Sequence, residues 1–121
     1  MTLFAVALVI AILHHSAFVY YWYWLYWWFD IVVHFLGGFF IGLSTMWLCR
    51  YVVQGTFVTQ SREWMLTFGV VAVVAGLWEI FELYGGIANA IEPGFFIDTT
   101  LDLCVGLFGG GIAWLLTKTR T

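Results

Sequence analysis

The stretch Trp78-Glu79-Ile80-Phe81-Glu82 decides how this chain is read, because it places two carboxylates three residues apart inside a run that is otherwise almost wholly apolar. On a helix, positions i and i+3 share a face, so Glu79 and Glu82 point the same way. A carboxylate in apolar surroundings costs free energy unless it is paired or neutralised. The rest of the sequence must therefore show what surrounds these two acids and what neutralises them.

The chain as a whole is too apolar for a soluble protein. Of its 121 residues, 64% are hydrophobic and 9% are charged, and the mean hydropathy is +0.99. Soluble domains are about 25% charged, and a chain this short has too much surface to bury so many apolar side chains. The composition indicates a membrane protein, and its length indicates one domain over residues 1–121. We expect membrane lipids as its surroundings and no nucleic-acid partner.

Four hydrophobic segments are long enough to cross a membrane. They cover approximately residues 2–21, 29–53, 64–84 and 98–117. A transmembrane helix needs roughly 20 residues, and the strands of a barrel would instead alternate apolar and polar positions. The sequence therefore predicts an all-α, polytopic membrane protein that folds as a bundle of four transmembrane helices.

The basic residues predict the orientation of this bundle. Arg50 and Arg62 flank the connection between the second and third spans, and Lys118 and Arg120 follow the fourth. With four spans these residues all lie on one side, which the positive-inside rule makes cytoplasmic. Both termini are then cytoplasmic, and we expect the chain in the inner (cytoplasmic) membrane.

The first outer connection, Tyr20 to Phe29, is almost entirely aromatic. Amphipathic rings prefer the headgroup level of a bilayer, so this stretch is typical of an interfacial belt. A platform for a pigment, a quinone or a lipid headgroup is the alternative interpretation.

Two G-x-x-x-G motifs predict close helix contacts. Gly38 and Gly42 form one in the second span, and Gly106 and Gly110 form the other in the fourth. Small residues at this spacing let helix backbones approach each other. We expect the second and fourth spans to pack inside the bundle, with homodimerisation as the lesser alternative.

Three pairs of ionisable residues are predicted to lie at a similar depth in the outer half of the bilayer. The pairs are Asp30 with His34, Glu79 with Glu82, and Asp98 with Asp102. Their spacings of three or four residues place each pair on one helix face. Five carboxylates thus share a small region on the side of the membrane that has no Lys or Arg.

Such carboxylates either bind a cation or hold protons. We predict that all six residues form a site for one or two divalent metal ions, since inward-facing carboxylates and histidine from several helices build such sites in bundles. Oxygen ligands with one imidazole suit iron, manganese, magnesium or zinc. The alternatives are a proton-holding cluster with raised pKa values, and side chains that only hydrogen-bond neighbouring helices.

Two further histidines, His14 and His15, lie in the first span. Either is a candidate additional ligand or proton relay, with plain hydrogen bonding between helices as the alternative. Adjacent residues are about 100° apart around a helix, so at most one of the two should point inward.

The ordered motifs Asp30-Ile-Val-Val-His34-Phe35, Glu79-Ile-Phe-Glu82 and Asp98-Thr-Thr-Leu-Asp102 resemble those of the YjdF-like bacterial inner-membrane proteins. They resemble the VanZ-like proteins more distantly. The resemblance covers roughly residues 30–110. It implies a small helical membrane protein with an acidic polar core, and the VanZ-like relatives imply a connection to the cell envelope.

The leading functional hypothesis is a metal-dependent membrane enzyme acting on a lipid or lipid-linked envelope substrate. A hydrolase is favoured over an oxidase, because di-iron bundles use two Glu-x-x-His motifs and this set has only one histidine. Glu82 is the candidate catalytic acid–base. The alternatives are a proton- or cation-conducting oligomer, and a structural or accessory subunit of a larger membrane complex.

Overall fold

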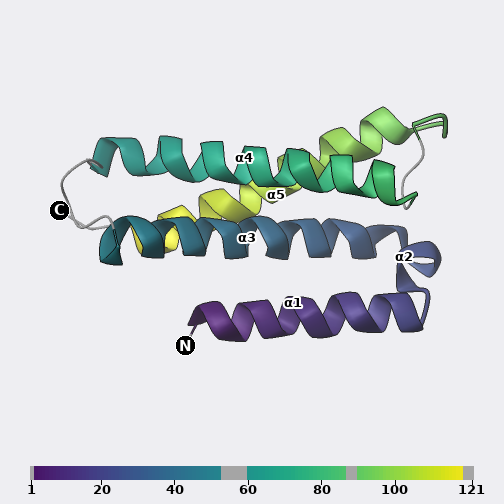
Figure 1. The fold of residues 1–121 in the computed structure, drawn as a ribbon, viewed down its shortest axis with the longest axis horizontal. Helices are drawn as coiled ribbons and strands as arrows, with labels where there is room; N and C mark the ends of the chain where they lie inside the picture. The colour runs from purple at the N-terminus through teal and green to yellow at the C-terminus, as the bar shows by residue number, and fades with distance from the viewer. Residues whose placement is uncertain (1, 53–59, 87–89, 119–121) are drawn as a thin grey trace.

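The computed structural model describes residues 2–52, 60–86 and 90–118, and all of its regular structure is helical. The helices are α1 (Thr2–Val19), α2 (Trp22–Leu25), α3 (Trp27–Tyr51), α4 (Gln60–Gly85) and α5 (Phe95–Thr117) (Figure 1). All but the short α2 are long and apolar enough to cross a membrane. The predicted all-α bundle of four transmembrane helices is therefore confirmed, with boundaries displaced by a few residues.

The four long helices alternate in direction, so the first residues of α1 and the last residues of α5 lie at the same end of the bundle (Figure 1). We call this the basic end, because Arg50 lies in the last turn of α3, Arg62 lies near the start of α4, and Lys118 follows α5. The fourth basic residue, Arg120, lies outside the described residues. The opposite end carries the Tyr20–Phe29 stretch and is called the aromatic end.

The first predicted span runs two residues too far, because the chain turns sharply after α1. Tyr21 has a φ of 59° and a ψ of 30°, the left-handed backbone conformation that residues other than glycine seldom adopt. One turn of helix, α2, follows this residue. Tyr26 is then extended, with a φ of −128° and a ψ of 97°, and precedes α3. The aromatic connection is therefore a folded corner that contains a helical turn.

The rings of this corner divide into two groups. Trp27 is 80% exposed and Tyr21 is 65% exposed, as suits rings at the surface of a membrane. Phe29 is only 5% exposed, and the rings of Trp22 and Tyr23 pack edge-on against it. Part of the stretch thus has the exposure expected of an interfacial belt, while its inward rings hold the corner against the bundle.

Helices α3 and α5 form the closest contact in the fold. A Cβ atom at Gly38 would overlap the backbone of Gly106, and one at Gly42 would meet Gly110 and Ala113. The two G-x-x-x-G motifs therefore face each other, which confirms that the second and fourth spans pack together. Helix α4 completes a three-helix unit, since Val71 is fully buried and lies against Gly110.

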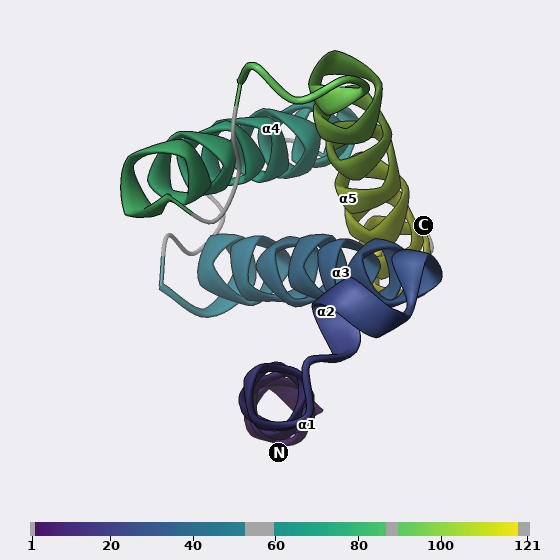
Figure 2. The ribbon, with the colours of Figure 1, turned by 90° about the vertical axis from the view of Figure 1, so that its right-hand side faces the viewer.

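Helix α1 stands apart from this unit (Figure 2). Its backbone approaches α2 and α3 but not α4 in the described part of the chain. Ala17 is the only buried residue of α1. This separation leaves a cavity between α1, α3 and α4.

Candidate metal centre

The three predicted pairs meet at the aromatic end of the bundle. Helices α3 and α5 begin there and carry Asp30 and Asp98 in their first turns. Helix α4 ends there and carries Glu79 and Glu82 in its last two turns. The alternating direction of the helices is therefore what brings segments far apart in the sequence to one level.

His34 lies at the centre of the cluster. Its Nε2 atom is 3.5 Å from Oδ1 of Asp30 and 3.8 Å from Oδ2 of Asp102. The side chains of His34 and Asp102 are 8% and 4% exposed, whereas the Asp30 side chain is 31% exposed. A buried imidazole is thus held between carboxylates of α3 and α5.

Two groups of three residues have ligand atoms close enough together to hold a metal ion. They are Asp30, His34 and Asp102, and His34, Glu79 and Glu82; within each group one ligand atom per residue lies within 4.8 Å of the others. Both groups contain His34, so the five residues form one continuous cluster from three helices. We call these five residues the acidic cluster.

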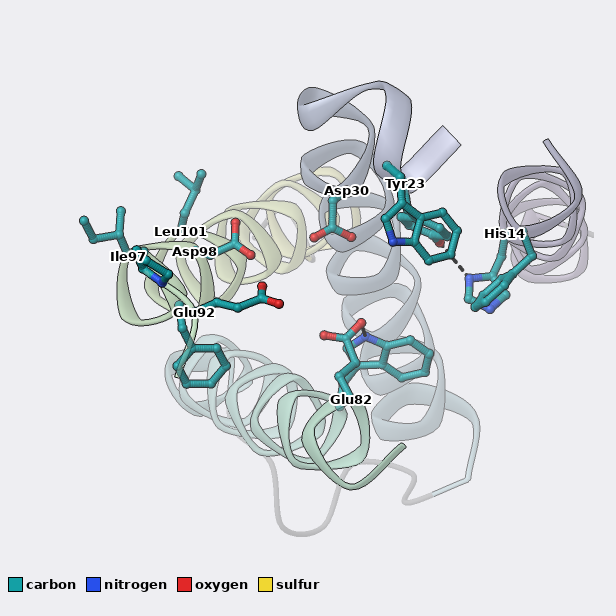
Figure 3. A pocket seen from close by; sticks show the side chains of 14 residues that line it. His14, Tyr23, Asp30, Glu82, Glu92, Ile97, Asp98 and Leu101 are labelled. Atoms are coloured by element: carbon teal, nitrogen blue, oxygen red, sulfur yellow. Dashed lines mark hydrogen bonds between the residues drawn. The ribbon is translucent and has the colours of Figure 1, made fainter. Parts of the chain in front are cut away.

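Asp98, the sixth predicted ligand, belongs to neither group in the described residues. It is exposed and lines a cavity of about 510 Å³ that opens at the aromatic end. The carboxylates of Asp30, Glu82, Glu92 and Asp98 point into this cavity (Figure 3). Asp98 and Glu92 therefore stand at its rim, where they add negative charge without joining the acidic cluster.

Several buried polar atoms of the acidic cluster have no hydrogen-bond partner among the described residues. They are Nε2 of His34, Oε1 of Glu79 and Oδ1 of Asp102. Leaving a buried polar group unpaired costs about 1–3 kcal/mol, and more when the group is charged. Three such atoms, contributed by three helices and lying close together, are characteristic of a site that binds a polar ligand or an ion.

No Lys or Arg side chain in the described part of the chain is placed to neutralise the cluster, and His34 is its one basic member. Arg50 and Arg62 lie at the opposite ends of α3 and α4. The Arg50 guanidinium donates to the Thr117 carbonyl, and the Lys118 ammonium lies over the Trp114 ring. The cluster is therefore a concentration of negative charge, which attracts cations.

Of the two histidines in α1, His14 lines the cavity and His15 is exposed on another face. The Tyr23 hydroxyl lies 2.7 Å from Nδ1 of His14 (Figure 3). Burial, together with the negative charges of Asp30 and Glu82, raises the pKa of Tyr23 to about 12. The phenol therefore keeps its proton, and it shares a hydrogen bond with Nδ1 of His14 whose direction depends on the tautomer of the imidazole.

Two residues beside the cavity were not expected from the sequence. Tyr23 was indistinguishable from its aromatic neighbours, because only the turn at Tyr21 directs it inward. Trp78 precedes Glu79 and donates from Nε1 to Oε1 of Glu82 at 2.9 Å. Its spacing of four residues from Glu82 is a detectable signal for this hydrogen bond.

Comparison with known families gives one finding. The family described as predicted membrane protein (DUF2238) matches residues 1–121. Comparison with curated proteins and with solved structures gives no match.

Proposed function

The chain belongs to the DUF2238 family of predicted membrane proteins, and we propose that it uses the acidic cluster as a divalent metal centre of a membrane hydrolase. The resemblance of its motifs to YjdF-like proteins agrees with this family, while the distant resemblance to VanZ-like proteins stays a prediction. Iron, manganese, magnesium and zinc all suit a ligand set of carboxylates with one imidazole.

One observation carries this proposal: buried, unpaired ligand atoms of His34, Glu79 and Asp102 converge from three helices. A structural role would be served by hydrogen bonds among these residues, but Oε1 of Glu79 and Oδ1 of Asp102 accept none. Nε2 of His34 also makes no hydrogen bond, and its nearest carboxylate oxygen is at the longer ion-pair distance of 3.5 Å. A divalent cation would satisfy all three and offset the surrounding negative charge.

The chemistry favoured is hydrolysis. The acidic cluster would hold a divalent ion, which when bound would supply Lewis-acid polarisation of an ester or phosphoryl oxygen and a more acidic water molecule. Glu82 then takes a proton from the attacking water and returns it to the leaving oxygen, while the new bond to the water oxygen forms and the ester bond breaks. Trp78 holds the Glu82 carboxylate in place through its indole N–H.

The substrate class follows from the surroundings of the cluster. The cavity opens at the aromatic end, beside rings that suit the headgroup level. A lipid or lipid-linked molecule of the envelope can present its headgroup there without leaving the bilayer. We propose the inner membrane as the location and the outer leaflet as the source of the substrate, on the distribution of Lys and Arg.

Metal analysis of the purified protein tests the proposal. We expect at least one divalent ion per chain in the wild type, and loss of the ion in His34→Ala and in Glu79→Gln. Glu63→Gln is the matched control, because Glu63 is also a buried glutamate of α4, 7% exposed, but lies at the basic end. Glu63→Gln should keep the metal.

Two results would count against a metal centre. One is a wild-type protein that holds less than one ion per chain after incubation with iron, manganese, magnesium and zinc. The other is an equal loss of metal in Glu63→Gln and Glu79→Gln. Purification in fixed stoichiometry with larger subunits would instead favour the accessory-subunit alternative.

A further inference from the structure

A second cavity, of about 340 Å³, lies deeper in the bundle between α1, α3 and α4. Aliphatic side chains and glycines line most of it, among them Ile10 and Ala11 of α1, Ile41 of α3, and Val74 and Ala75 of α4. It exists because α1 packs on α3 without approaching the backbone of α4. We call this cavity the apolar slot.

We call the cavity of about 510 Å³ at the aromatic end the acidic cavity. The apolar slot meets it at His14 and Trp78, which line both. Their rings contact edge-on with centroids 6.2 Å apart, from α1 and α4. His34 also lines the slot, so the central residue of the acidic cluster stands at its boundary. A molecule occupying both cavities would therefore pass from apolar to acidic surroundings beside the proposed metal ligands.

From this shared boundary we propose that the site takes an amphiphile, as substrate or as product, that places one hydrocarbon chain in the apolar slot and an oxyanion head, a phosphate ester or a released carboxylate, in the acidic cavity. The proposal rests on the metal centre proposed above. Within a bilayer, an apolar slot that reaches a polar site fits a lipid chain better than a polar occupant, because away from His14, His34 and Trp78 its lining is aliphatic, aromatic or glycine.

The charge of the head follows from the metal. Without a cation, the carboxylates of Asp30, Glu82 and Asp98 would repel an anionic head. With a divalent ion bound, an oxyanion can complete the coordination of the metal. Binding of the head should therefore depend on metal, whereas seating of the chain should not.

Photo-crosslinking in detergent tests both parts. The probes are palmitic acid with a diazirine in its chain and the corresponding neutral alcohol, and mass spectrometry locates the labelled residues. We expect palmitate to label slot residues such as Ile41 and Val74, with unlabelled palmitate competing. Lipid-facing positions such as Phe4 and Val73, which are 74% and 63% exposed, should show no such competition. Chelation should weaken labelling by the acid but not by the alcohol.

Gly37 offers a blocking substitution. It lines the slot, and a Cβ atom there meets nothing within 4 Å. Gly37→Leu should fill the slot and lower its labelling by about tenfold or more, as expected when overfilling a site costs at least about 1.4 kcal/mol. Gly69→Leu is the control, since Gly69 has equally free space but is exposed on α4 outside both cavities.

The outcomes separate this inference from the proposed function. Uniform labelling of all lipid-facing helices, without competition and unchanged in Gly37→Leu, would mean that only bulk bilayer lipid occupies the slot, and would overturn the inference. If Gly37→Leu keeps its metal and loses slot labelling, both proposals are supported. If the wild type lacks metal but its slot is labelled specifically, the proposed metal centre is wrong, while the proposed binding of a hydrocarbon chain in the apolar slot is supported.

Discussion

Asp98 and Asp102 stand one turn apart on α5, yet their surroundings differ. Asp102 is 3% exposed, and its Oδ2 faces Nε2 of His34 at 3.8 Å. Asp98 is exposed at the rim of the acidic cavity. Similar spacing in the sequence therefore does not mean a similar contribution to the site.

This difference predicts unequal effects on metal affinity. Asp102→Asn removes a buried ligand and should weaken binding by about 100-fold or more. Asp98→Asn removes only a nearby charge, and its effect should not exceed about tenfold, the lower range for residues outside the ligand set. Calorimetric titration of Zn²⁺ and Mn²⁺ into the metal-free protein measures both. Equal losses in the two variants would place Asp98 among the ligands.

Tyr23 allows a prediction about pH. Its pKa is raised from the ordinary 10.0 to about 12, so folding favours the neutral phenol. This stabilisation is complete below pH 10 and is lost as the pH rises toward 12. Tyr23→Phe removes the hydrogen bond to His14 and should lower the free energy of unfolding by about 1 kcal/mol near neutral pH. The difference from the wild type should shrink between pH 10 and 12.

Unfolding in detergent, followed by circular dichroism from pH 8 upward, measures this difference. Tyr20→Phe serves as the control, because Tyr20 belongs to the same aromatic stretch but is 61% exposed. A stability difference for Tyr23→Phe that stays constant up to pH 12 would contradict the proposed protonation of the buried phenol.

At the scale of single residues, the sequence predicted which ionisable residues pair on one helix face, but not the residues that contact them. The pairs were detectable because helix periodicity fixes which residues share a face. The contact between Asp30 and His34, four residues apart on α3, follows from this periodicity alone. The contact of Tyr23 with His14 depends on the left-handed backbone of Tyr21, and no local signal in the run of aromatic residues indicates that conformation. Asp102 is buried and Asp98 is exposed. The spacing of the pair alone does not specify this difference, because it depends on how α5 lies against its neighbours.

Among the elements, the contact between α3 and α5 sets the geometry of the site. Gly38 allows the backbone of Gly106 to approach, and this approach brings His34 and Asp102 to the same level. The neighbouring Gly37 faces the apolar slot, where an added Cβ meets nothing within 4 Å. Adjacent glycines of one helix thus have opposite surroundings.

Alanine substitutions at these two glycines should change the free energy of unfolding in opposite directions. Gly38→Ala forces α3 and α5 apart and should destabilise the fold by about 1–3 kcal/mol or more. Gly37→Ala relieves the conformational entropy of glycine in a helix and should stabilise by about 0.5–1 kcal/mol. Thermal unfolding of both variants in the same detergent tests this, and similar changes of the same sign would contradict the packing described.

The elements were predicted from the sequence with more success than their contacts. Hydropathy and length were sufficient for the four long helices, because a transmembrane span must be apolar over its whole length. The glycine motifs identified α3 and α5 as partners, because small residues at that spacing let two helix backbones approach closely. Helix α2 was missed, since one turn among aromatic residues has no periodicity to detect. The separation of α1 from α4 also has no signature in either helix.

For the whole molecule, the main consequence of the fold is a division of charge between its two ends. The acidic cluster and its cavity lie at the aromatic end, while Arg50, Arg62 and Lys118 lie at the basic end. By the positive-inside rule this division predicts the orientation of the chain, and with it the face of the membrane from which the proposed substrate would come. The predicted orientation is therefore a statement about function as well as topology.

Cysteine labelling in intact cells tests the orientation. In a background with Cys49→Ala and Cys104→Ala, Tyr84→Cys marks the aromatic end, since Tyr84 is 91% exposed near the end of α4. Lys118→Cys marks the basic end. A maleimide that cannot cross membranes should label Tyr84→Cys in intact cells and Lys118→Cys only after lysis, because the positive residues hold the basic end in the cytoplasm. The reverse pattern would put the acidic cavity in the cytoplasmic leaflet, so that its substrate would have to arrive from inside the cell.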